Sequence, residues 1–277
     1  MNLRPIGVFD SGFGGLSILR QIHAMLPQED VVFLADQAHV PYGNRSLQEV
    51  RAFSEEIARY LIERGVKLIV VACNTASAAA LYHLRQSFPS FPFVGMEPAV
   101  KPAAQSTQTR VVGVLATPAT FQGALFASVV ERFANDVTVL QQTLPHLVEQ
   151  IEAGDFTGSA TRGILERAVE PLLAEGVDTL VLACTHYPFI IPILQQIVGP
   201  EVNVIDPSPA IARQTKRLIN QHGLRAPADR VGRMTYISST DSPRLREMSQ
   251  HLIGLDGDVQ SIHWDGMRLK TEDSSEE

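Results

Sequence analysis

The chain has little sulfur, little positive charge and no long apolar run. Its 277 residues include two cysteines, one tryptophan, 23 Lys and Arg, and 30 Asp and Glu. Two cysteines cannot build the dense disulfide framework of a small secreted domain, so we expect free thiols. A formal charge of −7 argues against a nucleic-acid partner, because phosphate binding requires a basic face.

Membrane and export signals are also lacking. No apolar run approaches the roughly 20 residues that span a bilayer. The first residues, MNLRPIGVFDSG, contain no apolar core of the kind found in a signal peptide. We therefore expect a cytoplasmic protein without a membrane partner. The acidic end KTEDSSEE, residues 270–277, is expected to be solvated.

What the chain does have is a large apolar fraction, 45% of its residues, in short β-rich runs that alternate with helical stretches. This alternation predicts an α/β fold with parallel sheets. The segment 46–65 predicts an amphipathic helix with a capping box at Ser46 and Glu49 and an end at Gly65. The inward stripe of that helix is Leu47, Val50, Ile57 and Leu61. The expected strands are 6–9, 31–35, 68–72, 93–96, 111–116, 137–140, 179–183 and 202–205.

The two halves of the chain resemble each other. Gly-Val pairs at 65–66 and 176–177 each precede a cysteine at the same spacing, and the pairs at 7–8 and 113–114 begin matching strands. GMEPA (95–99) has a counterpart in VIDPSPA (204–210). The matches share one order and offsets of about 110 residues, which favours an internal duplication. Chance remains the alternative, since many α/β strands begin with Gly-Val. We predict two pseudo-symmetric α/β domains with the active site in the cleft between them.

Both cysteines follow the ends of predicted strands, so Cys73 and Cys184 should face this cleft from opposite walls. A carbon acid is inverted when a base removes its proton on one face and an acid returns a proton on the other. Thiols suit both roles, because modest tuning makes the thiol and the thiolate available near neutral pH. We expect Asp10 to handle the proton of Cys73 if their strands are neighbours, and His186 to handle that of Cys184.

Small polar residues also follow the strand ends. Helix N-termini begin there, and their free amides favour carboxylates. Two such sites in duplicated halves would suit a dicarboxylic amino acid. These residues are Ser11, Asn74, Thr75, Thr117 and Thr185.

Each signal has a simpler interpretation. Cys73 alone can be a small buried apolar residue, and Asp10 can cap the following helix. A zinc site from Cys73, Cys184 and His186 is conceivable, but no CxxC or HExxH spacing supports it. The segment DSGFGG (10–15) lacks a full phosphate-loop motif.

Five stretches together resemble the cofactor-independent amino-acid racemases of the aspartate/glutamate type. They are GVFDSGFGGL (7–16), ADQAHVPYG (35–43), VVACNTASA (70–78), GVLATPAT (113–120) and LACTHYPFI (183–190). None would be decisive alone, but they occur in the family's order. One departure is GGLSIL (14–19) in place of the more usual GGLTV run, which we expect to change packing and not chemistry.

The resemblance implies interconversion of L- and D-glutamate by two cysteines, without pyridoxal phosphate or metal, and supply of D-glutamate for peptidoglycan. It implies that Cys73 and Cys184 are the acid/bases, that Asp10 and His186 assist them, and that Glu152 is a further assisting carboxylate. A solvated helix-end residue is the alternative for Glu152. The expected substrate contacts are Asp10, Ser11, Tyr42, Gly43, Asn74, Thr75, Thr117, Thr185 and His186.

The family architecture implies a first domain of residues 1–97 plus 208–277, a second of 98–207, and a homodimer. An aspartate racemase of the same family is the nearest alternative. A bilobal amino-acid-binding protein without chemistry is another, although a mere binder has no use for two placed thiols. A thiol-dependent hydrolase or lyase would need one nucleophile and an oxyanion site instead of matched cysteines.

Overall fold

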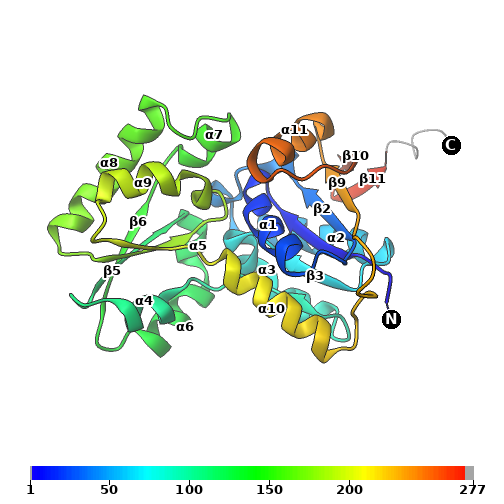
Figure 1. Ribbon diagram of the computed structural model, residues 1–277, viewed down its shortest axis with the longest axis horizontal. Coiled ribbons are helices and arrows are strands. Elements are labelled where there is room, and N and C mark those ends of the chain that lie inside the picture. Colours follow the sequence, from blue (N-terminus) through cyan, green and yellow to red (C-terminus); the bar gives the residue numbers. More distant parts are fainter. Residues whose placement is uncertain (1, 272–277) are drawn as a thin grey trace.

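The computed structural model describes residues 2–271, which form two lobes side by side (Figure 1). The larger sheet has the strand order β11-β10-β9-β2-β1-β3-β4. Its neighbours run parallel except for β10 and β11, which are antiparallel. Its strands are β1 (Ile6–Asp10), β2 (Val31–Ala35), β3 (Leu68–Val71), β4 (Phe93–Val94), β9 (Met234–Ser238), β10 (Asp258–Asp265) and β11 (Arg268–Thr271).

The second sheet is entirely parallel, with the order β6-β5-β7-β8. This order repeats β2-β1-β3-β4 of the first sheet, so the two halves share one topology. The predicted α/β class with two pseudo-symmetric parallel-sheet domains is confirmed. The strands are β5 (Val111–Ala116), β6 (Thr138–Thr143), β7 (Thr179–Ala183) and β8 (Asn203–Ile205).

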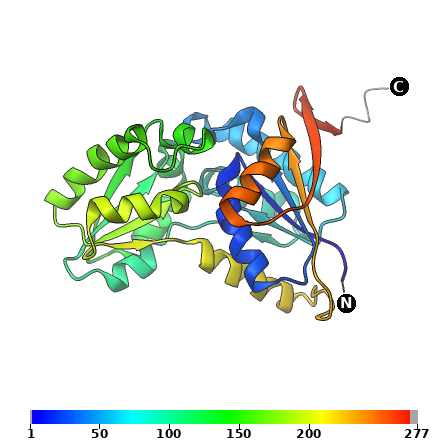
Figure 2. The same ribbon diagram turned by 45° about the horizontal axis from the view of Figure 1, so that its top comes forward.

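Helices cover both faces of each sheet (Figures 1 and 2). Those that lie before β4 or after β9 in the chain are η1 (Phe13–Gly15), α1 (Leu16–Met25), η2 (Gln37–His39), η3 (Tyr42–Asn44), α2 (Leu47–Glu63), α3 (Asn74–Ser87) and α11 (Ser242–Ile253). Those between β4 and β9 are α4 (Val100–Ser106), α5 (Pro118–Gln122), α6 (Ala124–Phe133), α7 (Leu147–Glu152), α8 (Ser159–Ala174), η4 (Tyr187–Ile190), α9 (Ile191–Val198) and α10 (Ser208–Gln221). No helix within 2–271 combines the length and apolar character needed to cross a bilayer.

The chain passes twice between the lobes. β4 belongs to the first sheet, whereas α4 packs on β5 and β7 of the second. β8 belongs to the second sheet, whereas α10 packs on α1 of the first lobe. The passages therefore lie in residues 95–99 and 206–207. The domain limits 1–97, 98–207 and 208–277 stay a prediction.

Parallel strands buried on both faces explain the continuous apolar runs of the sequence. On one face of the larger sheet, Val8 and Phe33 pack in a cluster with Ile22 of α1. On the other face, Phe9 and Val71 cluster with residues of α2 and α3. Two further clusters cover the second sheet in the same way. The apolar clusters on both faces thus fix the strands of both sheets, including their carboxyl ends.

The predicted helix at 46–65 is confirmed as α2. The Ser46 hydroxyl accepts from the Glu49 amide at 3.2 Å, and the Glu49 carboxylate accepts from the Ser46 amide at 3.0 Å. Gly65 follows with φ +76°, a conformation that glycine adopts without strain. Lys270 and Thr271, which we expected in a solvated tail, instead lie in β11. Residues 272–277 of that tail lie outside the described residues.

Candidate active site

Both cysteines line one small cavity where the two lobes meet. Cys184 directly follows β7, and Cys73 lies two residues past β3. Both are free and buried. The cavity has a volume of about 10 Å³, room for about one water molecule. Its lining residues are Ser11, Pro41, Tyr42, Gly43, Cys73, Asn74, Thr75, Thr117, Val148, Cys184, Thr185 and His186.

This lining brings together all the residues singled out by the sequence except two carboxylates, Asp10 and Glu152, which lie directly behind it. Asp10 is the last residue of β1, and β1 pairs with β3, which leads to Cys73. The sequence analysis expected Asp10 to serve Cys73 only if their strands are neighbours, and β1 and β3 are neighbours. Glu152 ends α7 in the other lobe.

Cys73 is held as a thiol. Its sulfur caps α3 by accepting from the Ala76 amide at 3.5 Å, and the Asp10 carboxylate is the charged group that acts on it. Burial, and then the neighbouring Asp10 charge, raise the pKa of Cys73 well above its ordinary value. The proton of this thiol thus has one obvious acceptor, the carboxylate of Asp10.

Asp10 is fully buried and held by three donors. Its Oδ1 accepts from the Ser11 amide at 2.6 Å and from the Ser11 hydroxyl at 3.3 Å, and its Oδ2 accepts from the Thr185 hydroxyl at 2.8 Å. Burial raises the pKa of Asp10, while the His186 charge and the hydrogen bonds from Thr185 and Cys73 oppose the rise. A carboxyl group with a raised pKa takes up a proton more readily than an ordinary carboxylate. Its bond to Thr185 joins the two walls of the cleft.

The Cys184 side uses a different set of groups. His186 Nδ1 lies 3.8 Å from Cys184 Sγ, and its Nε2 lies 2.6 Å from Glu152 Oε1. The Phe13 amide of the other lobe donates to the same oxygen at 2.7 Å. Burial alone would lower the pKa of His186, but its bonds with Cys184 and Glu152 raise it well above the ordinary value. The imidazole can therefore carry a proton between sulfur and carboxylate.

Hydroxyl and amide groups complete the inner surface. Thr75 Oγ1 lies 2.9 Å from Thr117 Oγ1 and 3.2 Å from Thr120 Oγ1, so the hydroxyls form one cluster across the cleft. Asn74 donates to Met96 Sδ at 3.8 Å. Its buried side-chain oxygen has no partner in the part of the chain that the structure describes. An unpartnered acceptor at a cavity wall is available to a ligand that donates hydrogen bonds.

Asp36 is a polar centre that the sequence prediction missed. It is fully buried after β2 and accepts from four donors, Tyr42 Oη at 2.6 Å, His39 Nδ1 at 2.9 Å, Ser239 Oγ at 2.8 Å and Trp264 Nε1 at 2.7 Å. It therefore ties Tyr42 to β9 and β10, and burial with the Asp36 charge raises the pKa of Tyr42 well above its ordinary value. The sequence did carry a signal for Asp36, because it directly follows the predicted strand 31–35 just as Asp10 directly follows the predicted strand 6–9.

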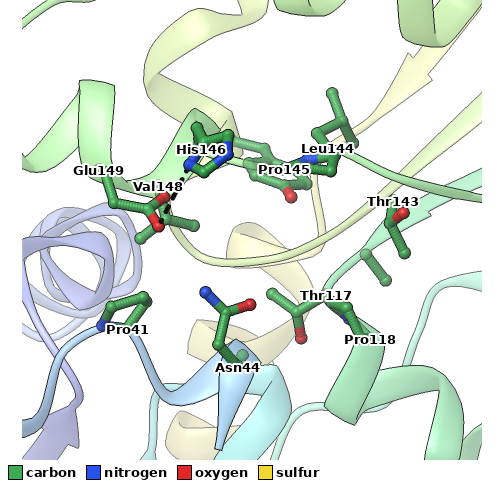
Figure 3. Close-up of a pocket in the computed structure, with 13 residues that line it drawn as sticks. Pro41, Asn44, Thr117, Pro118, Thr143, Leu144, Pro145, His146, Val148 and Glu149 are labelled. Atoms are coloured by element: carbon green, nitrogen blue, oxygen red, sulfur yellow. Dashed lines mark ion pairs between the residues drawn. The ribbon is translucent and has the colours of Figure 1, made fainter.

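A second cavity of about 70 Å³ adjoins the first. Figure 3 shows Pro41, Asn44 and Thr117 on one side of it and the loop Thr143–His146 on the other. His146 and Glu149 form an ion pair at 4.0 Å over its rim. The two cavities share Pro41, Gly43, Thr117 and Val148. The second cavity is therefore a direct neighbour of the space between the cysteines.

The geometry offers no support for a zinc centre. Within residues 2–271, no three or more His, Cys, Asp and Glu side chains are grouped so that they could hold a metal ion. The segment DSGFGG forms the end of β1 and the η1 turn, where Gly14 lies against His186 and Thr185. Glycine is needed there for close approach between the lobes, since a Cβ would come within 2.5 Å of both side chains.

Two opposed thiols, each with its own proton partner at the cleft of a duplicated α/β fold, define an acid–base site for a carbon acid. The chain belongs to the Asp/Glu/Hydantoin racemase family, whose model matches residues 6–215.

Relatives within the family are similar over most of their length. The chain is 51% identical to a glutamate racemase of Ectopseudomonas mendocina over 90% of this chain and 95% of that protein. The crystal structure of Francisella tularensis glutamate racemase in complex with D-glutamate has a TM-score of 0.83 and 27% identity, covering 96% of this chain and 99% of that one. The Escherichia coli glutamate racemase structure with L-glutamate and the activator UDP-MurNAc-Ala has a TM-score of 0.82 and 31% identity, covering 95% and 100%.

Proposed function

We propose that this protein is a glutamate racemase that interconverts L- and D-glutamate with two cysteines and no cofactor. The observation that carries the proposal is the single interlobe cavity lined by both Cys73 and Cys184, with a separate proton partner behind each sulfur. The names and high identity of the relatives support glutamate as the substrate.

In the proposed reaction, the thiolate of one cysteine takes the α-proton of glutamate and leaves a carbanion. The thiol of the other cysteine donates a proton to the opposite face, so the centre is inverted and the roles of the two sulfurs are exchanged. Asp10 receives or returns the proton of Cys73. His186, backed by Glu152, does the same for Cys184. Each sulfur then returns to its starting form through its own partner: one partner takes up a proton, the other gives one up, and both are reset by proton exchange with solvent.

Substrate binding would use the polar lining of the cavity. The first amides of α3 and the clustered hydroxyls of Thr75 and Thr117 offer donors to carboxylate oxygens. The free side-chain oxygen of Asn74 offers an acceptor to the ammonium group. The remaining predicted contacts, Ser11, Tyr42, Gly43 and Thr185, line the same space and are proposed to fix the second carboxylate and the orientation of the α-carbon.

The test is solvent exchange without added cofactor. L-Glutamate incubated with the protein in D₂O should lose its α-proton NMR signal and its optical activity. Cys73→Ala and Cys184→Ala should each abolish racemisation, with a loss of at least about 10²-fold for removal of an acid–base group. Absence of exchange with the wild type would rule out the activity and favour a binding protein. Near-normal racemisation by either variant would rule out the two-base scheme.

The same assay run with aspartate separates the family's alternatives. We propose that kcat/KM for aspartate is lower than for glutamate, and equal values would contradict the assignment of the substrate. We further propose that the protein is cytoplasmic, supplies D-glutamate for peptidoglycan and forms a homodimer. Sedimentation equilibrium tests the last point, since a molecular mass of one chain would contradict it.

A further inference from the structure

Ser17 is a buried hydroxyl that bridges the two lobes. It is the second residue of α1 and has no exposed surface. Its Oγ lies 2.8 Å from the Gly14 carbonyl oxygen of its own turn and 3.0 Å from the Thr185 carbonyl oxygen of the opposite lobe. Its single proton therefore serves a carbonyl in each lobe. The Ser17 bridge lies beside the cavity between the cysteines, because Thr185 lines that cavity.

The Thr185 carbonyl has a specific need for this donor. In the turn after β7, the amide three residues on would normally bond to this oxygen, but that residue is Pro188, which has no N–H. The next amide, that of Phe189, instead donates to His186 O at 3.2 Å. Among residues 2–271, Ser17 is the one hydrogen-bond donor to Thr185 O. Without it a buried carbonyl would be left unpaired.

The peptide group that Ser17 holds connects Thr185 to His186. The orientation of this peptide sets the direction in which the His186 side chain leaves the backbone. The His186 ring must lie between Cys184 Sγ at 3.8 Å and Glu152 Oε1 at 2.6 Å. On the same residue, the Thr185 hydroxyl bonds to Asp10. A rotation of this peptide would therefore disturb the Cys184 side directly and the Cys73 side only through one hydroxyl.

We propose that Ser17 is a positioning residue for proton transfer at Cys184, an inference that rests on the proposed racemase function. The hydroxyl contacts neither sulfur and lies behind the turn that carries His186. The departure from the family's usual GGLTV run thus keeps the part of the side chain that the site uses, its hydroxyl. We expected the GGLSIL departure to change packing and not chemistry, but the two hydrogen bonds of the Ser17 hydroxyl go beyond packing.

The experiment compares Ser17→Ala with a matched control, Ser54→Ala. Ser54 is equally buried, and its hydroxyl donates to Val50 O at 2.7 Å within α2, away from His186. Both variants lose one buried hydroxyl and should show a similar decrease in Tm. We expect Ser17→Ala to lower kcat by roughly tenfold, because small misplacement of a catalytic group is costly, and Ser54→Ala to retain wild-type kcat. Ser17→Thr, which keeps the hydroxyl, should restore kcat to within about twofold of wild type.

Primary isotope effects on kcat/KM with α-deuterated L- and D-glutamate give the decisive readout. When transfer at Cys184 is slowed, the effect should grow for the enantiomer whose proton Cys184 removes and shrink for the other. Wild-type isotope effects in Ser17→Ala, or equal changes for both enantiomers, would overturn the proposal. If Ser17→Ala does not fold, Ser17→Cys, with its weak donor, serves in the same comparison. Lack of racemisation by the wild type would refute the proposed function instead.

Discussion

At the scale of single residues, the two sulfurs differ in what surrounds them. Cys73 faces a buried carboxylate, whereas Cys184 faces an imidazole that is backed by another carboxylate. The first partner can only receive a proton when it is negative, and the second can only donate when it is positive. The two sulfurs therefore exchange protons with partners of different kinds, a carboxylate that accepts at Cys73 and an imidazole that can donate at Cys184, which suits the sulfurs to opposite roles.

The raised pKa of His186 leads to a prediction on stability. A histidine whose pKa is higher in the folded than in the unfolded protein adds stability that is complete below about pH 6.5 and is lost as the pH rises through the folded value. His186→Asn removes this contribution. The wild type should therefore exceed the variant in Tm most clearly near pH 6, and the gap should narrow towards alkaline pH. A gap that stays constant from pH 6 to alkaline pH would contradict the assignment of the proton to His186.

At the scale of elements, α2 tests how far local sequence rules hold. Its capping box satisfies the backbone amides of Ser46 and Glu49 at the first turn, and neither residue lines the cavity between the cysteines. Ser46→Ala should lower the free energy of unfolding by about 1 kcal/mol and leave kcat unchanged. Ser46→Asp, which supplies another capping oxygen, should recover most of the loss. Urea denaturation followed by circular dichroism measures both, and an unchanged midpoint for Ser46→Ala would show that the cap is dispensable.

The sequence predicts the elements with strong local patterns and the side chains at their ends. It identified the eight strands around the two cleft walls, and the polar residues that follow them do line one cavity. It missed β9 to β11, since the long strand β10, which lies between β9 and the edge strand β11, has one buried residue among partly buried and exposed ones. Such a strand lacks the apolar run of a central parallel strand.

Contacts between distant segments were beyond local reasoning. Nothing near Glu152 in the chain indicates its bond to His186, and only the family resemblance pointed to it. The contact between Asp10 and Cys73 depended on which strands are neighbours, a question of topology. The Phe13 amide and the Ser17 hydroxyl were invisible because their role comes from the approach of one lobe to the other.

At the scale of the whole molecule, α11 reaches across to the second lobe. Arg244 Nη2 donates to the Glu152 carbonyl oxygen at 2.7 Å, at the end of α7, and its guanidinium lies 5.8 Å from the centre of the Phe13 ring. Phe13 in turn donates its amide to the Glu152 carboxylate. One cation therefore contacts both partners of a bond between the lobes.

We expect Arg244→Ala to reduce kcat/KM for glutamate by roughly threefold to tenfold, since one hydrogen bond contributes about 0.5–1.5 kcal/mol net. Arg244→Lys should retain part of the effect. Arg246→Ala is the matched control, because Arg246 lies on the same helix but pairs with Asp256 at 2.6 Å. The test is steady-state measurement of kcat/KM for glutamate on the three variants. Equal losses for Arg244→Ala and Arg246→Ala would mean that α11 acts through general stability.

The cavity lined by both cysteines holds about one water molecule, so an amino acid can reach the sulfurs only if the lobes separate. The chain passes between the lobes at two places, residues 95–99 and 206–207. A single connection would let one lobe swivel in any direction, whereas two tethers confine the relative rotation to the line that joins them. Closing about that line would bring the two sulfurs back to opposite sides of the substrate, which is the placement that inversion of the α-carbon requires.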